Sequence, residues 1–133
     1  MLAPSKPLLD LLKQLGIQAV TDITGFGLAG HLIEMLESSD KKARLHLESV
    51  PSMPGVEALF QQGLESTLAP GNRKHDRLIH RDHELADHPR YSSLFDPQTC
   101  GGLLFGLAQH RIPEMISAAD LSLIHISEPT RPY

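Results

Sequence analysis

The sequence predicts an α+β domain, a single unit of helices and short strands. Apolar residues recur at helical spacing over residues 4–15 and again over residues 28–36. Residues 43–48 alternate apolar and polar side chains, as a strand with one buried face does, and residues 101–107 have the character of a second strand. With 133 residues and 41% hydrophobic content, the chain has the size and the apolar material for one domain.

Local signals mark where these elements begin and end. Gly16 follows the first helix and Gly63 follows an apolar stretch, and glycine is the usual residue just past a helix C-terminus. The second helix is expected to end near residues 38–40. In chain order, the expected elements are helices over residues 4–15, 28–36, 56–62 and 113–119 and strands over residues 43–48 and 101–107.

Residues 64–92 are expected to form a long loop, because they are polar, contain proline and are rich in His, Arg and Asp. One helical turn is expected near residues 77–79. A loop of this length in a compact domain is usually functional or mobile. Two histidine pairs in it, His80 with His83 and His83 with His88, have spacing that suits a transition metal. A solvated loop is the favoured interpretation, because structural zinc sites usually have tighter ligand pairs and often cysteine.

Composition argues against several classes of function. The net charge of −4 disfavours nucleic acid as a partner, since affinity for phosphate backbones comes from clustered Lys and Arg. No apolar run approaches the ~20 residues that span a membrane, and residues 1–7 lack the pattern of a secretory leader. Cys100 is the only cysteine, so no internal disulfide can form. We therefore expect a soluble, cytoplasmic protein that binds neither nucleic acid nor membrane.

Residues 25–30, GFGLAG, satisfy the G-x-G-x-x-G pattern of dinucleotide sites, and they open a helix as such a site requires. Glu48 also lies about 20 residues further on, where a carboxylate would bind the ribose. Against this interpretation, residues 19–24 are too polar for a parallel strand buried on both faces, and no further β–α units follow. A glycine turn that only lets helix and strand pack is the simpler hypothesis. A noncatalytic nucleotide-binding module is the alternative function.

Two long motifs carry a resemblance to a known family. Residues 21–32, TDITGFGLAGHL, and residues 96–104, DPQTCGGLL, are similar to two signatures of the C-terminal domain of selenophosphate synthetases, also called selenide, water dikinases. Residues 50–56, VPSMPGV, resemble the family's proline-bounded entry to a helix. The resemblance covers residues 16–120, with the motifs in the family's order. These synthetases belong to the superfamily of aminoimidazole ribonucleotide (AIR) synthetase.

The resemblance implies an AIR synthase C-terminal-like α+β domain, in which a mixed or antiparallel sheet packs with helices. It also implies a reaction in which ATP, selenide and water give selenophosphate, AMP and phosphate. In such enzymes a separate N-terminal domain binds ATP and forms the homodimer, so we expect residues 1–120 alone to be inactive. A sister enzyme of the same superfamily, acting in purine or thiamine-phosphate synthesis, is a second alternative.

The resemblance also implies roles for particular residues. Asp22 matches an aspartate that the family uses as a Mg²⁺ ligand, together with carboxylates of the other domain; taken alone, an aspartate before a helix is more often a cap or turn residue. Gly25 and Gly27 are expected to help hold a phosphate of ATP through backbone N–H groups. His31 belongs to the motif and receives no catalytic role. Cys100 is expected to be a small, partly buried thiol. It is not expected to be the nucleophile, because the family's catalytic Cys or selenocysteine and its Lys precede the ATP-binding domain.

Two segments depart from the family's pattern. Residues 66–72, STLAPGN, differ from its common Pro-Gly-Gly-Thr form and look more like the version found in fusions with a flavin-dependent oxidoreductase. Residues 121–133, LSLIHISEPTRPY, are interpreted as a non-native tail translated from a library adapter, with a native strand over residues 121–126 as the alternative. We therefore expect a partial domain over residues 1–120, truncated at its C-terminal end and only marginally stable in isolation.

Overall fold

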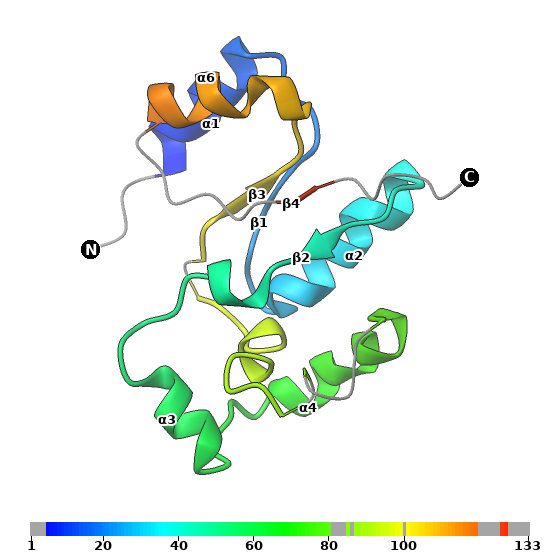
Figure 1. Cartoon of the computed structure of the whole chain (residues 1–133), viewed down its shortest axis with the longest axis vertical. Helices are drawn as coiled ribbons and strands as arrows, with labels where there is room; N and C mark the ends of the chain where they lie inside the picture. The colour runs from blue at the N-terminus through cyan, green and yellow to red at the C-terminus, as the bar shows by residue number, and fades with distance from the viewer. Residues whose placement is uncertain (1–4, 81–84, 86, 100, 120–125, 128–133) are drawn as a thin grey trace.

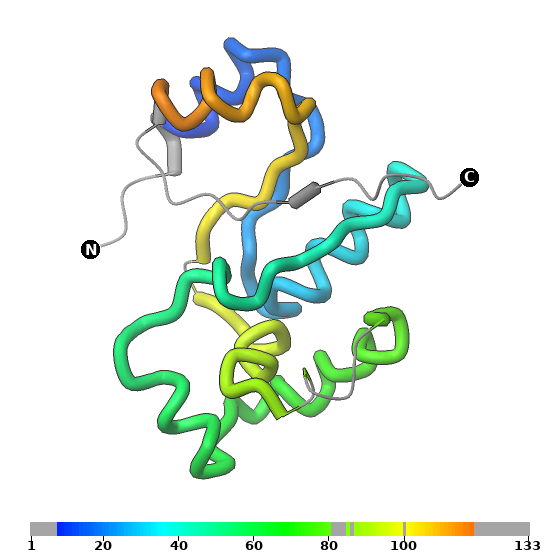
Figure 2. Tube along the Cα trace, in the orientation of Figure 1, coloured from blue at the N-terminus to red at the C-terminus, as the bar shows by residue number. Residues whose placement is uncertain are grey.

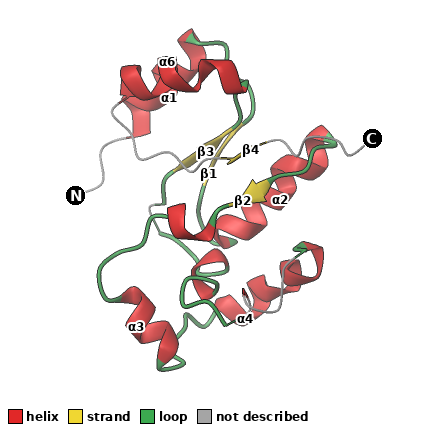
Figure 3. Ribbon diagram, viewed as in Figure 1, coloured by secondary structure: helices red, strands yellow, loops and turns green. Residues whose placement is uncertain are grey.

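A computed structural model of the chain describes residues 5–80, 85, 87–99, 101–119 and 126–127. Figure 3 shows that helices outweigh strands. The helices are α1 (Ser5–Gln14), α2 (Gly27–Ser39), α3 (Val56–Gln61), α4 (Ala69–Asn72) and α6 (Ile112–Ala119), with 3-10 helices η1 (Leu47–Ser49), η2 (Arg73–Leu78), η3 (Ser92–Leu94) and η4 (Gln109–Arg111). The strands are β1 (Val20–Asp22), β2 (Arg44–Leu45), β3 (Leu103–Phe105) and β4 (Ile126–Ser127).

A two-stranded ribbon of β1 and β3 runs through the middle of the molecule (Figure 1). The strands are antiparallel, and Val20, Thr21 and Asp22 lie opposite Phe105, Leu104 and Leu103, respectively. Hydrogen bonds extend the pairing by one residue at each end, from Ile23 N–H to the Gly102 carbonyl and from Gly106 N–H to the Ala19 carbonyl. Helices around a small antiparallel sheet confirm the predicted α+β class.

Each face of the ribbon covers a different hydrophobic core, because successive side chains of a strand point to opposite sides. Leu103 and Phe105 pack on the first core, whereas Leu104 is buried in the second. The first, the α1/α6 core, lies between the ribbon and those two helices and has the buried residues Leu12, Ile17 and Met115. The second, the motif-side core, has the buried residues Leu28, Ala29, Leu32, Val50, Tyr91, Leu94, Phe95 and Leu104.

The helices follow the periodicity that predicted them. Leucines spaced along α1 place Leu12, only 1% exposed, in the α1/α6 core. Gly16 then takes a positive φ of 67°, which ends the helix as expected. The other three predicted helices are confirmed as α2, α3 and α6, and the trace in Figure 2 shows α2 crossing beside the ribbon.

The strand predicted over residues 43–48 is shorter in the structure. Only Arg44 and Leu45 form the strand, and after His46 the chain turns into the 3-10 helix η1. Hydrogen bonds from Ser49 N–H to the His46 carbonyl and from Val50 N–H to the Leu47 carbonyl close this turn. Val50, 6% exposed, enters the motif-side core directly after it, so burial of one side chain overrides the alternating pattern.

The long loop predicted over residues 64–92 contains more helix than one turn at residues 77–79. The helix α4 and the 3-10 helix η2 together cover residues 69–78. Pro70 occupies the second residue of α4, where a missing N–H has no cost because the first N–H groups of a helix have no partner within it. Ala69 and Asn72, 1% and 6% exposed, face the interior. Tertiary packing therefore orders a segment whose composition indicated a loop.

The strand β4 lies in the segment interpreted as a non-native tail. Its two residues pair antiparallel with β2, Arg44 opposite Ser127 and Leu45 opposite Ile126. The remainder of that segment, residues 121–125 and 128–133, lies outside the described residues, so the origin of the tail stays a prediction. Cys100, predicted to be a partly buried thiol, also lies outside them. No helix in the described part of the chain has the length and apolar character to cross a bilayer.

Candidate functional site

Asp22, the predicted metal ligand, is the last residue of β1. It lies opposite Leu103 and shares a face of the ribbon with Val20, on the side of the α1/α6 core. Unlike Val20 it is exposed, because the ribbon ends here. A carboxylate is thus presented to solvent from a strand that hydrogen bonds hold on both sides of it. This is a suitable placement for a ligand that must reach a metal outside the domain.

The glycine turn follows directly. The carbonyl oxygen of Thr24 accepts hydrogen bonds from Gly27 N–H (3.1 Å) and from Gln98 N–H (3.0 Å). Gly27 has a φ of 70°, and a β-carbon there would lie 2.9 Å from the carbonyl oxygen of Leu94. Only glycine therefore fits at this position. Gly25 is exposed, and a β-carbon there would meet open space.

The two sequence motifs meet at this turn. Ile23 of the first motif donates its N–H to Gly102 of the second (3.0 Å). A β-carbon on Gly101 would collide with the carbonyl oxygen of Ile23, so a side chain at 101 would push the motifs apart. The glycines of both motifs thus allow backbone to lie against backbone, as the simpler hypothesis for the G-x-G-x-x-G turn predicted. The turn also starts helix α2 at Gly27, after the N-cap residue Phe26.

His31, which the sequence gave no catalytic role, is buried at 7% exposure against the turn. Its Nε2 accepts the N–H of Thr24 (3.1 Å) and lies 3.2 Å from the Thr24 hydroxyl. Accepting that N–H requires the neutral tautomer with its hydrogen on Nδ1, which faces the carboxylate of Glu34 at 3.7 Å. The ring of Phe26 lies 5.5 Å from the His31 ring. The side chain therefore fixes the turn rather than reaching solvent.

Asn72 is a site residue that sequence reasoning missed. Its amide Nδ2 donates to the carbonyl oxygens of Gly25 (2.8 Å), inside the first motif, and Phe95 (3.0 Å), directly before the second. The neighbouring Arg73 lies over the Phe95 ring at 5.1 Å and donates to the Ser92 hydroxyl at 2.9 Å. Residues 66–72 departed from the family's pattern, but a single asparagine in a polar segment gives no signal of burial.

Two acidic residues, Glu65 and Asp96, line a hollow of about 280 Å³ beside α3. Burial raises the pKa of the Asp96 carboxyl; a hydrogen bond from Gln98 opposes the shift and the charge of Glu65 adds to it. For Glu65, burial alone would raise the pKa. Hydrogen bonds from Arg73 and Ser92, together with the Arg73 charge, outweigh burial and hold the pKa of Glu65 below its ordinary value.

Magnesium suits the donor chemistry at Asp22. The ion binds oxygen ligands and is usually held by one or two carboxylates with phosphate and water. Within the described residues, no three His, Cys, Asp or Glu side chains gather as a metal cluster. Asp22 is thus a single exposed oxygen donor, which fits Mg²⁺ only if further ligands come from elsewhere.

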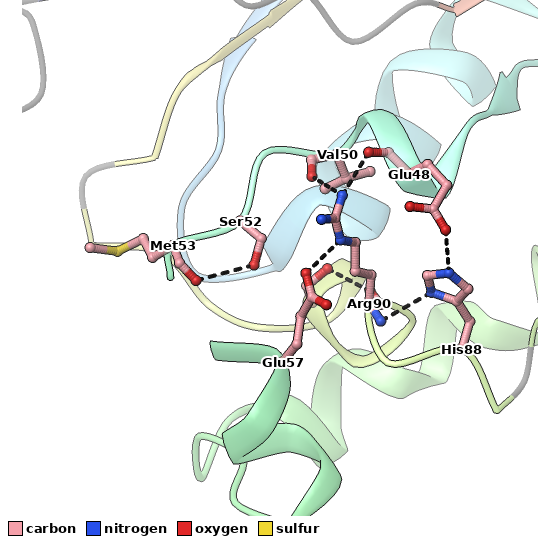
Figure 4. A network of polar contacts seen from close by, with 8 residues as sticks. Glu48, Val50, Ser52, Met53, Glu57, His88 and Arg90 are labelled. Carbon is pink, nitrogen blue, oxygen red and sulfur yellow. Dashed lines mark hydrogen bonds and ion pairs between the residues drawn. The ribbon is translucent and has the colours of Figure 1, made fainter. Parts of the chain in front are cut away.

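Among the histidines of the long segment, His88 is engaged in other contacts. His88 Nε2 lies 2.7 Å from a carboxylate oxygen of Glu48, and His88 Nδ1 accepts the N–H of Arg90 at 3.1 Å. Arg90 also binds Glu57 at 2.6 Å and the Glu48 carbonyl at 2.6 Å, as Figure 4 shows. This network joins α3 to η1 and engages both ring nitrogens of His88, which argues against that histidine as a transition-metal ligand. His83 lies outside the described residues.

Comparison with known proteins matches residues 5–120 to the family described as AIR synthase related protein, C-terminal domain. The chain belongs to this family. The membership confirms the AIR synthase C-terminal-like fold that the two motifs predicted. The matched residues include both motifs.

Curated relatives of this AIR synthase related domain carry the name selenide, water dikinase. The protein of Pseudomonas putida is 40% identical over 111 residues, which are 81% of this chain and 31% of that protein. The protein of Shewanella putrefaciens is 38% identical over 109 residues, 82% of this chain and 30% of that protein. A protein of Shewanella baltica is 38% identical over 105 residues, which are 79% of this chain and 29% of that protein. The recognised resemblance is confirmed, and the chain spans about a third of the length of these relatives.

Proposed function

We propose that this domain is the C-terminal part of a selenide, water dikinase, which makes selenophosphate, AMP and phosphate from ATP, selenide and water. In this proposal Asp22 joins carboxylates of an N-terminal ATP-binding domain around Mg²⁺. The observation that carries it is the exposed Asp22 carboxylate at the end of β1, inside a motif that packs directly on the second motif. Relatives at 38–40% identity with that name support the reaction class.

Each residue of the turn has a defined part in this proposal. Bound Mg²⁺ neutralises phosphate charge, which is much of what phosphoryl transfer requires. Asp22 supplies one hard oxygen for it. Gly25 is exposed at the start of α2, where backbone N–H groups favour an anion. Gly27 contributes through its positive φ and close approach to Leu94, because its own N–H already binds Thr24.

The partners follow from the same proposal. The parent protein is expected to be a cytoplasmic homodimer whose N-terminal domain binds ATP and dimerises, and the isolated chain is expected to be inactive. A net charge of −4 offers no support for nucleic-acid binding.

The test is a chimera in which residues 5–120 replace the matching part of the Pseudomonas putida relative. ³¹P NMR of ATP, selenide and Mg²⁺ should show selenophosphate and AMP, and Asp22→Asn should lower the rate at least ~100-fold by removing a carboxylate ligand. Asp10→Asn, an exposed carboxylate on α1, is the matched control and should leave the rate unchanged. A fully active Asp22→Asn chimera would remove the metal role. A folded, ATP-binding chimera without product would favour a sister enzyme of the superfamily.

The noncatalytic nucleotide-binding alternative makes a different prediction. Dinucleotide sites follow a parallel strand of a larger sheet, whereas β1 is three residues long and antiparallel to β3. Calorimetric titration of the chain with NAD separates the hypotheses. Binding that Gly25→Val abolishes would support the alternative, and the dikinase proposal expects no binding.

A further inference from the structure

We infer that His31 and Asn72 are positioning residues that hold the backbone after Asp22, and so fix the place of its carboxylate for the metal. The inference rests on the proposed function and adds two residues to its site. Neither side chain touches the metal in this role. They act through the peptide groups of residues 23–25.

Hydrogen bonds hold the backbone just after Asp22 at each of residues 23, 24 and 25. Ile23 N–H donates to Gly102, and the Thr24 carbonyl accepts from Gln98 and Gly27. Two further ties come from side chains. The N–H of Thr24 donates to His31 Nε2 at 3.1 Å, and the carbonyl of Gly25 accepts from the amide of Asn72 at 2.8 Å.

Both side chains are buried, His31 at 7% and Asn72 at 6% exposure. A buried polar group is costly unless it is hydrogen-bonded, so each side chain has little freedom to leave its partner. They also come from different elements: His31 lies in α2, which starts at the turn, and Asn72 lies in α4, 47 residues after Gly25 in sequence. Asn72 reaches Phe95 as well, so the same amide fixes the distance between the turn and the second motif.

The exposed carboxylate of Asp22 gains from this arrangement. A ligand on a mobile backbone must be ordered when the metal binds, and that ordering weakens affinity. Metal ligands whose supporting hydrogen bonds are removed typically lose 10–100-fold in affinity. Loss of either tie should therefore weaken metal binding while leaving the number and charge of the ligands unchanged.

The experiment measures Mn²⁺ affinity by EPR titration in the same chimera, with ATP present. Asn72→Leu and His31→Leu, close in volume to the native side chains, should each weaken Mn²⁺ binding ~10–100-fold. Excess Mg²⁺ should restore most of the rate of selenophosphate formation in both leucine variants. It should not do so in Asp22→Asn, which lacks a metal ligand. His31→Gln places an amide oxygen that can accept the Thr24 N–H and should recover affinity. The rate of amide hydrogen exchange at residues 21–28 should rise in both leucine variants. In His31→Gln it should be close to the wild-type rate.

Met115→Leu in the α1/α6 core is the matched control. Met115 is fully buried on the face of the ribbon opposite the motif-side core, against which His31 and Asn72 lie. It should change neither Mn²⁺ affinity nor exchange at residues 21–28. Unchanged Mn²⁺ affinity in folded Asn72→Leu and His31→Leu chimeras would overturn the inference, as would an equal loss in Met115→Leu. If either leucine variant fails to fold, Asn72→Ser and His31→Ala, which also lacks an acceptor for the Thr24 N–H, decide by the same readouts. Asp22→Asn without effect on Mn²⁺ would refute the metal role of Asp22 in the proposed function instead, while the exchange data would still test whether His31 and Asn72 hold the backbone of residues 23–25.

Discussion

The two faces of the β1–β3 ribbon are built in different ways. The buried members of the α1/α6 core, Leu12, Ile17 and Met115, all have apolar side chains, and Leu12 and Met115 are almost completely buried. The motif-side core is larger, and the buried polar residues His31 and Asn72 lie against it. Its neighbours also include glycines, Gly27 and Gly101, that leave no room for a side chain.

The difference separates packing from positioning. Apolar contacts are non-directional, so a core of this kind tolerates volume-conserving changes. Hydrogen bonds and backbone contacts fix a single geometry, and they are found here around the turn that directly follows Asp22. One face of the ribbon thus supplies stability, and the other supplies stability together with a defined place for the site. The predictions that follow test this distinction.

The largest effect is expected for Phe95→Ala. Phe95 is completely buried, its ring meets Tyr91 edge-on at 5.4 Å, and Arg73 lies over its face. Truncation of a buried phenylalanine leaves a cavity and costs about 4 kcal/mol. Urea unfolding of the 133-residue chain measures the free energy of unfolding. Phe26→Ala, where the ring is 48% exposed, is the control and should cost below about 1 kcal/mol. Equal losses in the two variants would mean that the motif-side core is not packed as described.

Gly101→Ala should have the next largest effect. Its β-carbon would collide with the backbone oxygen of Ile23, which cannot rotate away as a flexible side chain could. Separating the two motifs should cost about 3 kcal/mol of unfolding free energy. Gly102→Ala is the adjacent control, because a β-carbon there meets open space. Should Gly101→Ala prove as stable as Gly102→Ala, backbone contact between the motifs would not be a constraint.

The same division explains what the sequence could predict. Leucine periodicity predicted α1 and its buried face, because burial of an amphipathic helix follows its own pattern. The paired glycine motifs predicted the turn and Asp22 through resemblance to a family. Neither signal reached Asn72, whose two hydrogen bonds join carbonyls 47 and 23 residues away in sequence. Long-range polar contacts leave no local periodicity, so composition alone made residues 69–78 look like a loop.

The smallest effect is expected for Asp96→Asn, because burial of the charged Asp96 carboxylate lowers the free energy of unfolding. Because burial raises its pKa above the ordinary 3.8, the folded state binds the proton more tightly than the unfolded chain does. Stability from this group is therefore lost as pH rises from about 3.8 through the folded pKa, and the penalty persists at pH 7. Asp96→Asn should remove the penalty and stabilise the chain at pH 7, by less than about 1 kcal/mol because solvent screens a partly buried group.

Unfolding of wild type and Asp96→Asn across pH isolates this contribution. Glu65 has the opposite dependence: its pKa is lowered, so its stabilisation is present at neutral pH and lost on acidification. The pH dependence of the wild-type free energy of unfolding contains the contributions of both Asp96 and Glu65. The difference in this free energy between wild type and Asp96→Asn should shrink to zero only at acidic pH. A variant less stable than wild type at pH 7 would mean that the charge of Asp96 is supported by its surroundings. In that case the surroundings of Asp96, next to the motif-side core, would stabilise the fold. The difference in role between this core and the α1/α6 core would then be smaller.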